Sequence, residues 1–265
     1  MEVNGQHTGA GPLPAPVVPA TRPAIRRAVP LLLLAVAGAS QARDTGWNWM
    51  IEPYAWAATI GTDLQTRSPP IEGEGELRFP DILDKLDGVF QLRVEGQGDR
   101  AGLFADFTYM GISSDRTGRV AETSTDLDMR LFEAASTWRT GSARGQGLEL
   151  FAGVRHIDVD LKVGFDPVNP LLVGRVLDEG RSFTDLMLGA RYTWALSDRW
   201  GLTLRGDGSL GDTEGTWNAG LTAHYRTGGG AWLFGYRHLQ ADLETDNAQA
   251  EVAMSGPTIG YGFRF

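Results

Sequence analysis

Alternation of apolar and polar residues with a period of two runs through most of the chain after residue 46. In one segment Trp217, Leu221 and Tyr225 share one parity, whereas Asn218 and His224 share the other. Because successive side chains of a strand point to opposite faces, this pattern predicts a strand with one apolar and one polar face. Its recurrence predicts ten strands, near residues 47–60, 88–97, 100–113, 123–139, 146–162, 181–195, 199–210, 215–227, 230–243 and 251–265.

The connections between these segments alternate in length. Short turns such as 97–99 and 196–198 are followed by longer loops such as 61–88 and 163–180. Short turns on one side, long loops on the other and an even strand number are typical of a closed antiparallel transmembrane β-barrel. We therefore predict an all-β barrel of about ten strands, and counts of eight or twelve also fit. Both termini would lie on the short-turn, periplasmic side, and Pro53 predicts a bulge in the first strand.

A soluble barrel or sandwich gives the same alternation with its apolar face inside. Two features of the strands favour a membrane barrel. The predicted strands often have a dozen residues, about twice the length usual in soluble proteins. Aromatic residues also gather at strand ends, as the girdles at a membrane interface require. These aromatic residues are Trp47, Trp49, Tyr109, Tyr192, Trp194, Trp200, Trp217, Tyr225 and Trp232.

The first 42 residues have a different composition from the rest. Arg26 and Arg27 precede the apolar run Ala28–Ala39, which ends in small residues. A basic segment, a short apolar run and an A-x-A-like end predict a cleavable secretory signal, and a buried core helix is the alternative. This run is also too short to cross a bilayer as a helix. We therefore divide the chain into a leader, residues 1–42, and an outer-membrane β-barrel, residues 43–265.

Composition excludes several classes of site. The sequence contains no cysteine, which excludes disulfides, thiolate metal sites, a cysteine nucleophile and a lipidated cysteine. Its formal net charge of −9 argues against nucleic-acid binding. Four acidic residues near the last loop could suggest calcium, but an EF-hand counted from the first would place Asn247 and Ala253 where glycine and glutamate are needed. No metal and no cofactor are expected. The four acidic residues near the last loop are Asp242, Glu244, Asp246 and Glu251.

The end of the chain resembles the C-terminal signal that bacterial barrel-assembly machinery recognises. It alternates through Ile259, Tyr261, Phe263 and the terminal Phe265. The resemblance implies that this last strand closes the barrel against the first, because a free apolar edge would aggregate. It also implies the assembly machinery as a partner during biogenesis.

Most of the segment 47–265 resembles a widespread family of bacterial outer-membrane β-barrel proteins to which no activity has been assigned. The resemblance implies the barrel fold and an outer-membrane location. The stretch 206–209 departs from the family, which usually has a more glycine-rich run there. The matching pieces are Pro53–Ala57, Phe79–Leu83, Gly189–Tyr192, Leu196–Trp200, Leu204–Asp207, Thr216–Trp217, Gly235–Arg237 and Gly256–Gly260.

If the apolar parity faces lipid, the polar parity faces the lumen and carries many charges. Arginines there should pair with carboxylates, because an unpaired charge in a narrow lumen is costly. A glycine two residues before Arg155, Arg191 and Arg237 would leave room for the side chains. The predicted luminal charges are Arg93, Glu95, Asp106, Asp128, Arg130, Arg155, Asp185, Arg191, Arg205, Asp207, Arg237 and Arg264, with Asn218 and His224 beside them.

The long loop at 61–88 contains a predicted helix over 79–88. Proline near its start, aspartate in its first turn and Gly88 at its end fit a short helix. Ile82, Leu83 and Leu86 would share one face. So short a helix needs its apolar face buried, so we expect it to pack at or inside the barrel mouth and to narrow any pore; a cap resting on the loops is the alternative.

These features predict an integral outer-membrane protein with a structural or interaction role and a lumen filled by ion pairs. The alternative is a narrow channel for small solutes or ions, since a ten-stranded lumen is small. An outer-membrane hydrolase is the third hypothesis, but His156 and His238 have the lipid-facing parity and His224 lies near a short-turn end. We therefore predict no enzyme activity. The expected partners are outer-membrane lipid and lipopolysaccharide.

Overall fold

The computed structural model describes residues 46–265 except 68–69, 119–120, 142–144, 168–173 and 245–247. The predicted leader, residues 1–42, lies outside the described residues, as does Asp246. The elements are β1 (Asn48–Trp56), β2 (Thr59–Arg67), β3 (Pro70–Leu77), α2 (Phe79–Leu83), β4 (Leu86–Gln97), β5 (Ala101–Thr117), β6 (Ala121–Arg139), β7 (Gly147–Pro167), β8 (Arg175–Ala195), β9 (Trp200–Gly211), β10 (Gly215–Arg226), β11 (Gly230–Glu244) and β12 (Ala248–Arg264).

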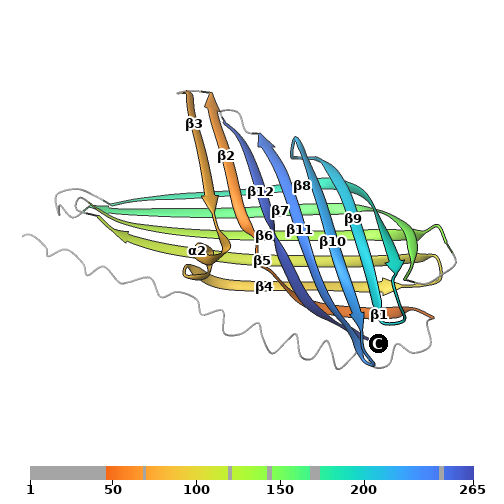
Figure 1. Cartoon of the computed structure of the whole chain (residues 1–265). Coiled ribbons are helices and arrows are strands. Elements are labelled where there is room, and N and C mark those ends of the chain that lie inside the picture. The colour runs from red at the N-terminus through yellow and green to blue at the C-terminus, as the bar shows by residue number, and fades with distance from the viewer. Residues whose placement is uncertain (1–45, 68–69, 119–120, 142–144, 168–173, 245–247) are drawn as a thin grey trace, which may run out of the picture. The chain divides into compact units, whose positions relative to one another are not determined.

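Ten of the strands, β1 and β4 to β12, form a closed antiparallel barrel (Figure 1). Each barrel strand pairs with its neighbours in sequence, and β12 pairs with β1 to close the ring, with Met50 opposite Arg264 and Trp56 opposite Thr258. Closure leaves no free edge within the ring, which is what a sheet needs in lipid. The predicted all-β barrel and its strand number are confirmed.

The strands β2 and β3 form a hairpin outside the ring of ten. The strand β2 continues the line of β1 along β12, because Thr59 lies opposite Ser255 in the same register. The predicted strand 47–60 is therefore interrupted only at Ala57 and Ala58. The bulge expected at Pro53 is wrong, since the register with β12 is the same on both sides of this residue and the pairing with β4 runs without a shift up to Pro53.

Barrel strands differ widely in length. The strands β7 and β8 have 21 residues each, whereas β9 and β10 have 12. At roughly 3.3 Å per residue the longest strands span about 70 Å, far more than a hydrocarbon core of about 30 Å. Much of the loop expected at 163–180 is in fact strand, because the ladder between β7 and β8 continues to Phe165 and Arg175. Figure 1 shows these strands extending well past β9 and β10.

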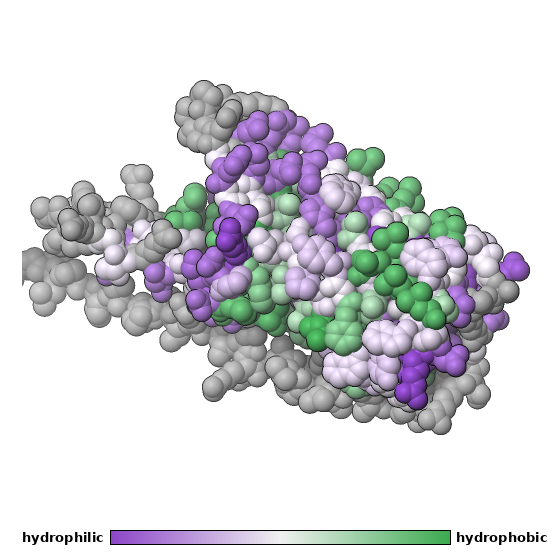
Figure 2. Space-filling view, in the orientation of Figure 1, coloured by the Kyte–Doolittle hydropathy of each residue, from purple (hydrophilic) through white to green (hydrophobic). Residues whose placement is uncertain are grey.

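Outward side chains of the strands are apolar and most inward ones are polar over the lower part of the barrel, the part toward the short turns; Phe104, Ala135, Phe151 and Met187 are inward apolar exceptions. Leu186 and Leu188 are 73% and 69% exposed, whereas Arg155 and Asn218 are 1% and 2% exposed. Figure 2 shows hydrophobic residues spread over the outer surface of the strands, with hydrophilic residues gathered where β2 and β3 project. Apolar side chains that face outward around a polar interior are the reverse of a soluble barrel and fit a barrel in lipid. Within the described residues, no helix is long and apolar enough to cross a membrane.

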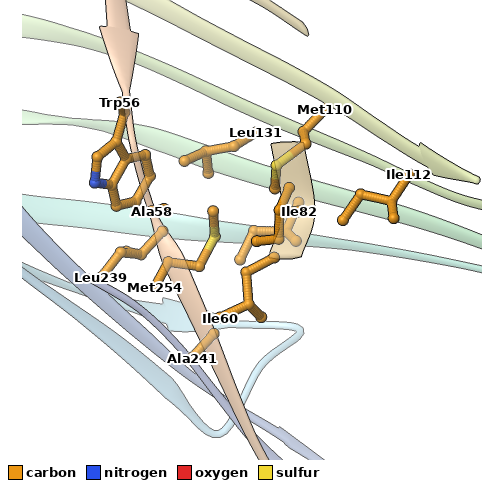
Figure 3. Packing of buried hydrophobic residues seen from close by; sticks show 11 residues of the cluster. Trp56, Ala58, Ile60, Ile82, Met110, Ile112, Leu131, Leu239, Ala241 and Met254 are labelled. Atoms are coloured by element: carbon orange, nitrogen blue, oxygen red, sulfur yellow. The ribbon is translucent and has the colours of Figure 1, made fainter. Parts of the chain in front are cut away.

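The upper interior of the barrel, away from the short turns, holds an apolar cluster of buried residues (Figure 3). The helix α2 contributes Ile82, which is 1% exposed and packs among side chains from β1, β2, β5 and β12. The helix is shorter than predicted, and Leu83 is exposed rather than on the packed face, whereas Leu86 packs against the cluster. The cluster comprises Trp56, Ala58, Ile60, Ile82, Met110, Ile112, Leu131, Ile157, Leu239, Ala241 and Met254.

Candidate functional site

The candidate site is a network of charged side chains in the barrel interior, below the apolar cluster. Strand periodicity places its members there: each residue two positions along a strand returns to the same face, so every strand contributes an inward row. Two groups of ion pairs result. We call them the central cluster (Glu133, Arg155, Arg205, Asp207 and Arg237) and the lower cluster (Arg93, Glu95, Asp106, Arg139, Glu149 and Arg191).

Glu133 is the hub of the central cluster. Its carboxylate accepts hydrogen bonds from Arg155 at 2.5 and 2.9 Å and from Arg205 at 3.1 Å. Arg237 approaches with Nη2 3.1 Å from Oε1 of Glu133, an ion pair without hydrogen-bond geometry, since this Nη2 has no hydrogen-bond partner. The side chains of Glu133 and Arg155 are fully shielded from solvent. Charges so deeply buried are tolerated only when paired on every side.

Asp207 completes the central cluster on the opposite side of Arg155. It accepts hydrogen bonds from Arg155, from Arg205 at 2.7 Å and from Asn218 at 2.8 Å. Asn218 in turn accepts a hydrogen bond from Nε of Arg237 at 2.9 Å. The cluster is therefore a connected network in which each arginine contacts at least one acidic group and polar amides or hydroxyls fill the gaps.

Asp185 extends this network towards the β9–β10 turn. Its carboxylate accepts hydrogen bonds from the hydroxyls of Ser209 at 2.9 Å and Thr213 at 2.6 Å, and from the backbone N–H of Thr213 at 3.1 Å. Ser209 also contacts Thr216, which is 2.5 Å from Nη1 of Arg155. Asp185 is thus satisfied by hydrogen bonds and makes no ion pair among the described residues.

The lower cluster joins opposite parts of the wall. Arg191 of β8 pairs with Glu95 of β4 and, at 2.5 Å, with Glu149 of β7. Glu95 also pairs with Arg93 at 3.2 Å, and Glu149 with Arg139 at 3.4 Å. With Asp106, which pairs with Arg93 at 3.3 Å, the cluster has three cations against three carboxylates and is electrically balanced.

Aromatic rings support the arginines from the side. The guanidinium of Arg93 lies 4.1 Å from the ring centroid of Phe104, and that of Arg237 lies 4.8 Å from Trp56. Arg205 lies 5.1 Å from Phe151. Such contacts place the positive charge against the negative face of the ring and fix the plane of the guanidinium.

Glycines make room for this packing. A Cβ added at Gly189 would lie 2.4 Å from the Cβ of Asp207 and 2.4 Å from the ring of Phe151. A Cβ at Gly153 would lie 1.9 Å from the carbonyl oxygen of Ala134. The glycines two residues before Arg155 and Arg191 therefore occupy positions where no larger residue fits.

Most of the predicted luminal residues face the interior, but Asp128 and Arg130 do not. They lie on the outer face of β6, where Asp128 accepts a hydrogen bond from Tyr109 at 2.8 Å and Arg130 pairs with Asp158 and with Asp160. The expectation failed because the apolar row at 127, 129 and 131 faces inward in this part of the barrel; Leu131 belongs to the buried apolar cluster. The inward group is Arg93, Glu95, Asp106, Arg155, Asp185, Arg191, Arg205, Asp207, Arg237 and Arg264.

Sequence reasoning missed several inward charges. Glu133 shares the parity of Leu131, which the alternation predicts to face lipid, although the apolar Phe132 and Trp138 on the other parity indicate the opposite; both are exposed in the structure. Glu149 shares the parity of Arg155, which is the signal that places it inside. Glu52 and Arg139 also lie inside, Glu52 beside a cavity and Arg139 at 4% exposure.

Histidines are scattered over the barrel. His156 contacts Thr184 at 2.8 Å on the outer face of β7. His238 packs against Trp217 with ring centroids 4.4 Å apart and the ring planes tilted by 37°, and it contacts Ser255 at 2.5 Å. His224 faces the interior and contacts Thr203 at 2.9 Å. Across the described part of the chain, no group of three metal-binding side chains comes together.

The described residues of the lumen line at least two cavities. One of about 510 Å³ lies at the short-turn end and is bounded above by Glu95, Glu149 and Arg191. The other, of about 140 Å³, lies at mid-height between Glu52, Arg93 and Arg237. Glu95 and Arg191 line both, so the lower cluster forms the partition between them.

Comparison with solved structures identifies the fold. The outer membrane protease OmpT from Escherichia coli matches with a TM-score of 0.53 and 10% identity, over 83% of this chain and 97% of that one. Ail, the attachment invasion locus protein of Yersinia pestis, matches with a TM-score of 0.39 and 9% identity, over 83% of this chain and 99% of that one. No protein-family model matches the sequence, and no curated protein matches it. The fold is thus that of bacterial outer-membrane β-barrels, and at such low identity the likeness does not extend to activity.

Proposed function

We propose that this chain is an integral outer-membrane barrel with a closed lumen, and that its role is structural or one of interaction through its surface and outer strands. The observation that carries the proposal is the lumen itself. Ion pairs cross it at two levels and an apolar cluster fills it above. A protein built to conduct would keep a continuous polar path, whereas this interior is occupied by side chains that hold one another.

The orientation follows from strand geometry. The short turns lie at one end of the barrel, together with the start of the first strand at Asn48 and the end of the last strand at Arg264. We assign this end to the periplasm by analogy with other bacterial barrels. The long strands then project outward, where their polar outer faces meet lipopolysaccharide. Arg130 with Asp158 and Asp160 lies on this projecting wall.

We also propose that assembly uses the C-terminal strand. Ile259 and Phe263 are about half exposed on the lipid-facing side of β12, and the same strand pairs with β1 to close the ring. A residue row that is both apolar and ring-closing fits recognition by the barrel-assembly machinery. We propose no catalytic role, because the three histidines of the barrel lie apart and contact hydroxyl groups rather than carboxylates.

A narrow channel is the second candidate, and the two cavities favour it. They lie end to end and share Glu95 and Arg191, so a change of side-chain positions in the lower cluster would join them. The apolar cluster would still have to open above them. This candidate therefore requires two movements, whereas the closed barrel requires none.

The deciding experiment is single-channel conductance of refolded protein, residues 43–265, in a planar lipid bilayer. A closed lumen predicts no steady conductance above that of bare lipid. Steady conductance whose ion selectivity changes in the Arg191→Gln or Arg237→Gln variant, and not in Arg199→Gln on the exposed rim, would instead establish a channel that passes the two clusters.

A further inference from the structure

We propose that the cavity of about 510 Å³ at the short-turn end of the barrel is a binding site for a small polar molecule that carries a negatively charged group. We call this cavity the vestibule. Its size falls in the range of small-molecule sites, roughly 300–1,000 Å³. The proposal concerns binding and not conduction, so it holds whether the lumen above is closed or not.

Two arginines define the charge of the vestibule. Arg226 of β10 and Arg264 of β12 both line it, and neither makes an ion pair among the described residues. They flank β11, with Arg226 opposite Ala231 and Ala231 opposite Gly262. At about 4.8 Å per strand, their Cα atoms lie on the order of 10–12 Å apart, so two guanidinium groups can approach one ligand.

The carboxylates of the vestibule do not cancel this charge. Only Glu95 and Glu149 of its lining are acidic, and Arg191 pairs with both of them. Arg93 and Arg139 provide each with a further cation. The positive charges of Arg226 and Arg264 are therefore left for an external anion, whereas the arginines of the lower cluster are balanced by its carboxylates.

The wall of the vestibule between Arg226 and Arg264 on one side and the lower cluster on the other is polar and neutral. Thr193 and Thr203 face each other with 2.8 Å between their hydroxyl oxygens, and His224 contacts Thr203 at 2.9 Å. Hydroxyl and imidazole groups can donate and accept hydrogen bonds, so they suit hydroxyl or amide groups of a ligand. The ligand class is thus a molecule with a phosphate or carboxylate near the mouth and polar neutral groups further in.

Binding is tested by isothermal titration of the refolded barrel in uncharged detergent at low salt, with inorganic pyrophosphate and citrate as probes. Saturable binding of at least one is expected, weakened about tenfold or more in Arg226→Gln and in Arg264→Gln, because a charge-assisted contact is lost. Arg199→Gln is the matched control, since Arg199 is an exposed rim arginine that does not line the vestibule. No saturable binding to the wild type, or equal binding to all three variants, would overturn the proposal.

A second measurement uses the absence of cysteine from the sequence. In a Thr193→Cys variant the introduced thiol should react faster with a sulfonate-bearing methanethiosulfonate reagent than with its trimethylammonium counterpart, and pyrophosphate should protect it. Adding Arg226→Gln and Arg264→Gln should remove the preference. Equal rates with both reagents in the parent variant would contradict an anion-selective vestibule independently of the titrations.

Discussion

Arg237 on β11 reaches Glu133 on β6 across the full width of the barrel, with 3.1 Å between Nη2 and Oε1. Four strands separate the two residues in each direction around the ring, so they lie on opposite walls. An ion pair in this position ties the walls together and occupies the axis of the lumen. Because Glu133 is also bonded to Arg155 and Arg205, one carboxylate holds three arginines in place.

Replacing Glu133 should therefore destabilise the barrel strongly. In Glu133→Gln three arginines keep their charge but lose the carboxylate between them, and removing one partner of a buried ion pair costs about 3–5 kcal/mol. Urea unfolding in lipid vesicles, followed by tryptophan fluorescence, measures the difference. Glu214→Gln, at an exposed turn, is the control and should unfold like the wild type. Equal midpoints for both variants would contradict the role given to Glu133.

A methyl group at Gly189 should be harmful where one at Gly206 is not. The Cβ of Gly189→Ala would overlap Asp207 and Phe151, whereas no atom lies within 4 Å of a Cβ at Gly206. Overpacking of this kind costs about 1–3 kcal/mol. The two alanine variants lie on adjacent strands, so comparing their free energies of unfolding isolates the effect of space. The idea fails if Gly206→Ala is as destabilising as Gly189→Ala.

The position of the lipid belt can be tested along a single strand. Leu188 and Val176 both point outward from β8, twelve residues apart, and both are largely exposed. In lipid vesicles Leu188→Arg should lower the free energy of unfolding by about 2–4 kcal/mol, because a charge near the bilayer centre is costly. Val176→Arg, on the part that projects into water, should change it little. The reverse order would mean that the membrane surrounds another part of the barrel.

The apolar cluster should act as the upper seal of the lumen. Ile82→Ser places a hydroxyl in its buried centre and shortens the side chain of α2, so water can enter from above. We expect small or intermittent conductance in a planar bilayer, where the wild type has none. Leu83→Ser changes the exposed neighbour of the same helix and should stay silent. A silent Ile82→Ser variant that still folds would show that the cluster is not the seal.

The inward and outward faces of the strands in the lower half of the barrel could be predicted from the sequence, because contact with lipid requires apolar outward side chains there. Around Trp217 the outward residues are apolar and the inward ones, Thr216 and Asn218, are polar, so the parity of a strand gives its faces directly. The strand number and the inward position of Arg155, Arg191 and Asp207 follow from this rule. Their particular partners depend on strand register, which alternation does not encode.

The faces of the strands in the upper half were predicted wrongly, because there the polar residues face outward and the apolar ones inward. Once the wall leaves lipid, Asp128 and Arg130 meet water outside while Leu131 is buried inside, as in a soluble barrel. The strand β6 has apolar inward residues in its upper part and polar inward residues in its lower part. A prediction that uses one parity for the whole strand therefore places Glu133 on the wrong face. The hairpin of β2 and β3 was missed for a related reason: its glycines and glutamates resemble a loop, and only pairing with β12 makes it a strand.

The unequal strand lengths also leave part of the backbone without a neighbour. On β8 pairing with β9 begins at Asp185, so residues 175–183 are held by β7 alone on one side, and no described strand covers the other. Such an edge is a template on which another extended chain can add by backbone hydrogen bonds, the usual origin of aggregation between sheets. Asp178, Glu179 and Arg181 place charged side chains along this edge. Natural sheets protect exposed edges with charged side chains, because another chain can pair there only by desolvating them, which gives this barrel a built-in resistance to aggregating through its tallest wall.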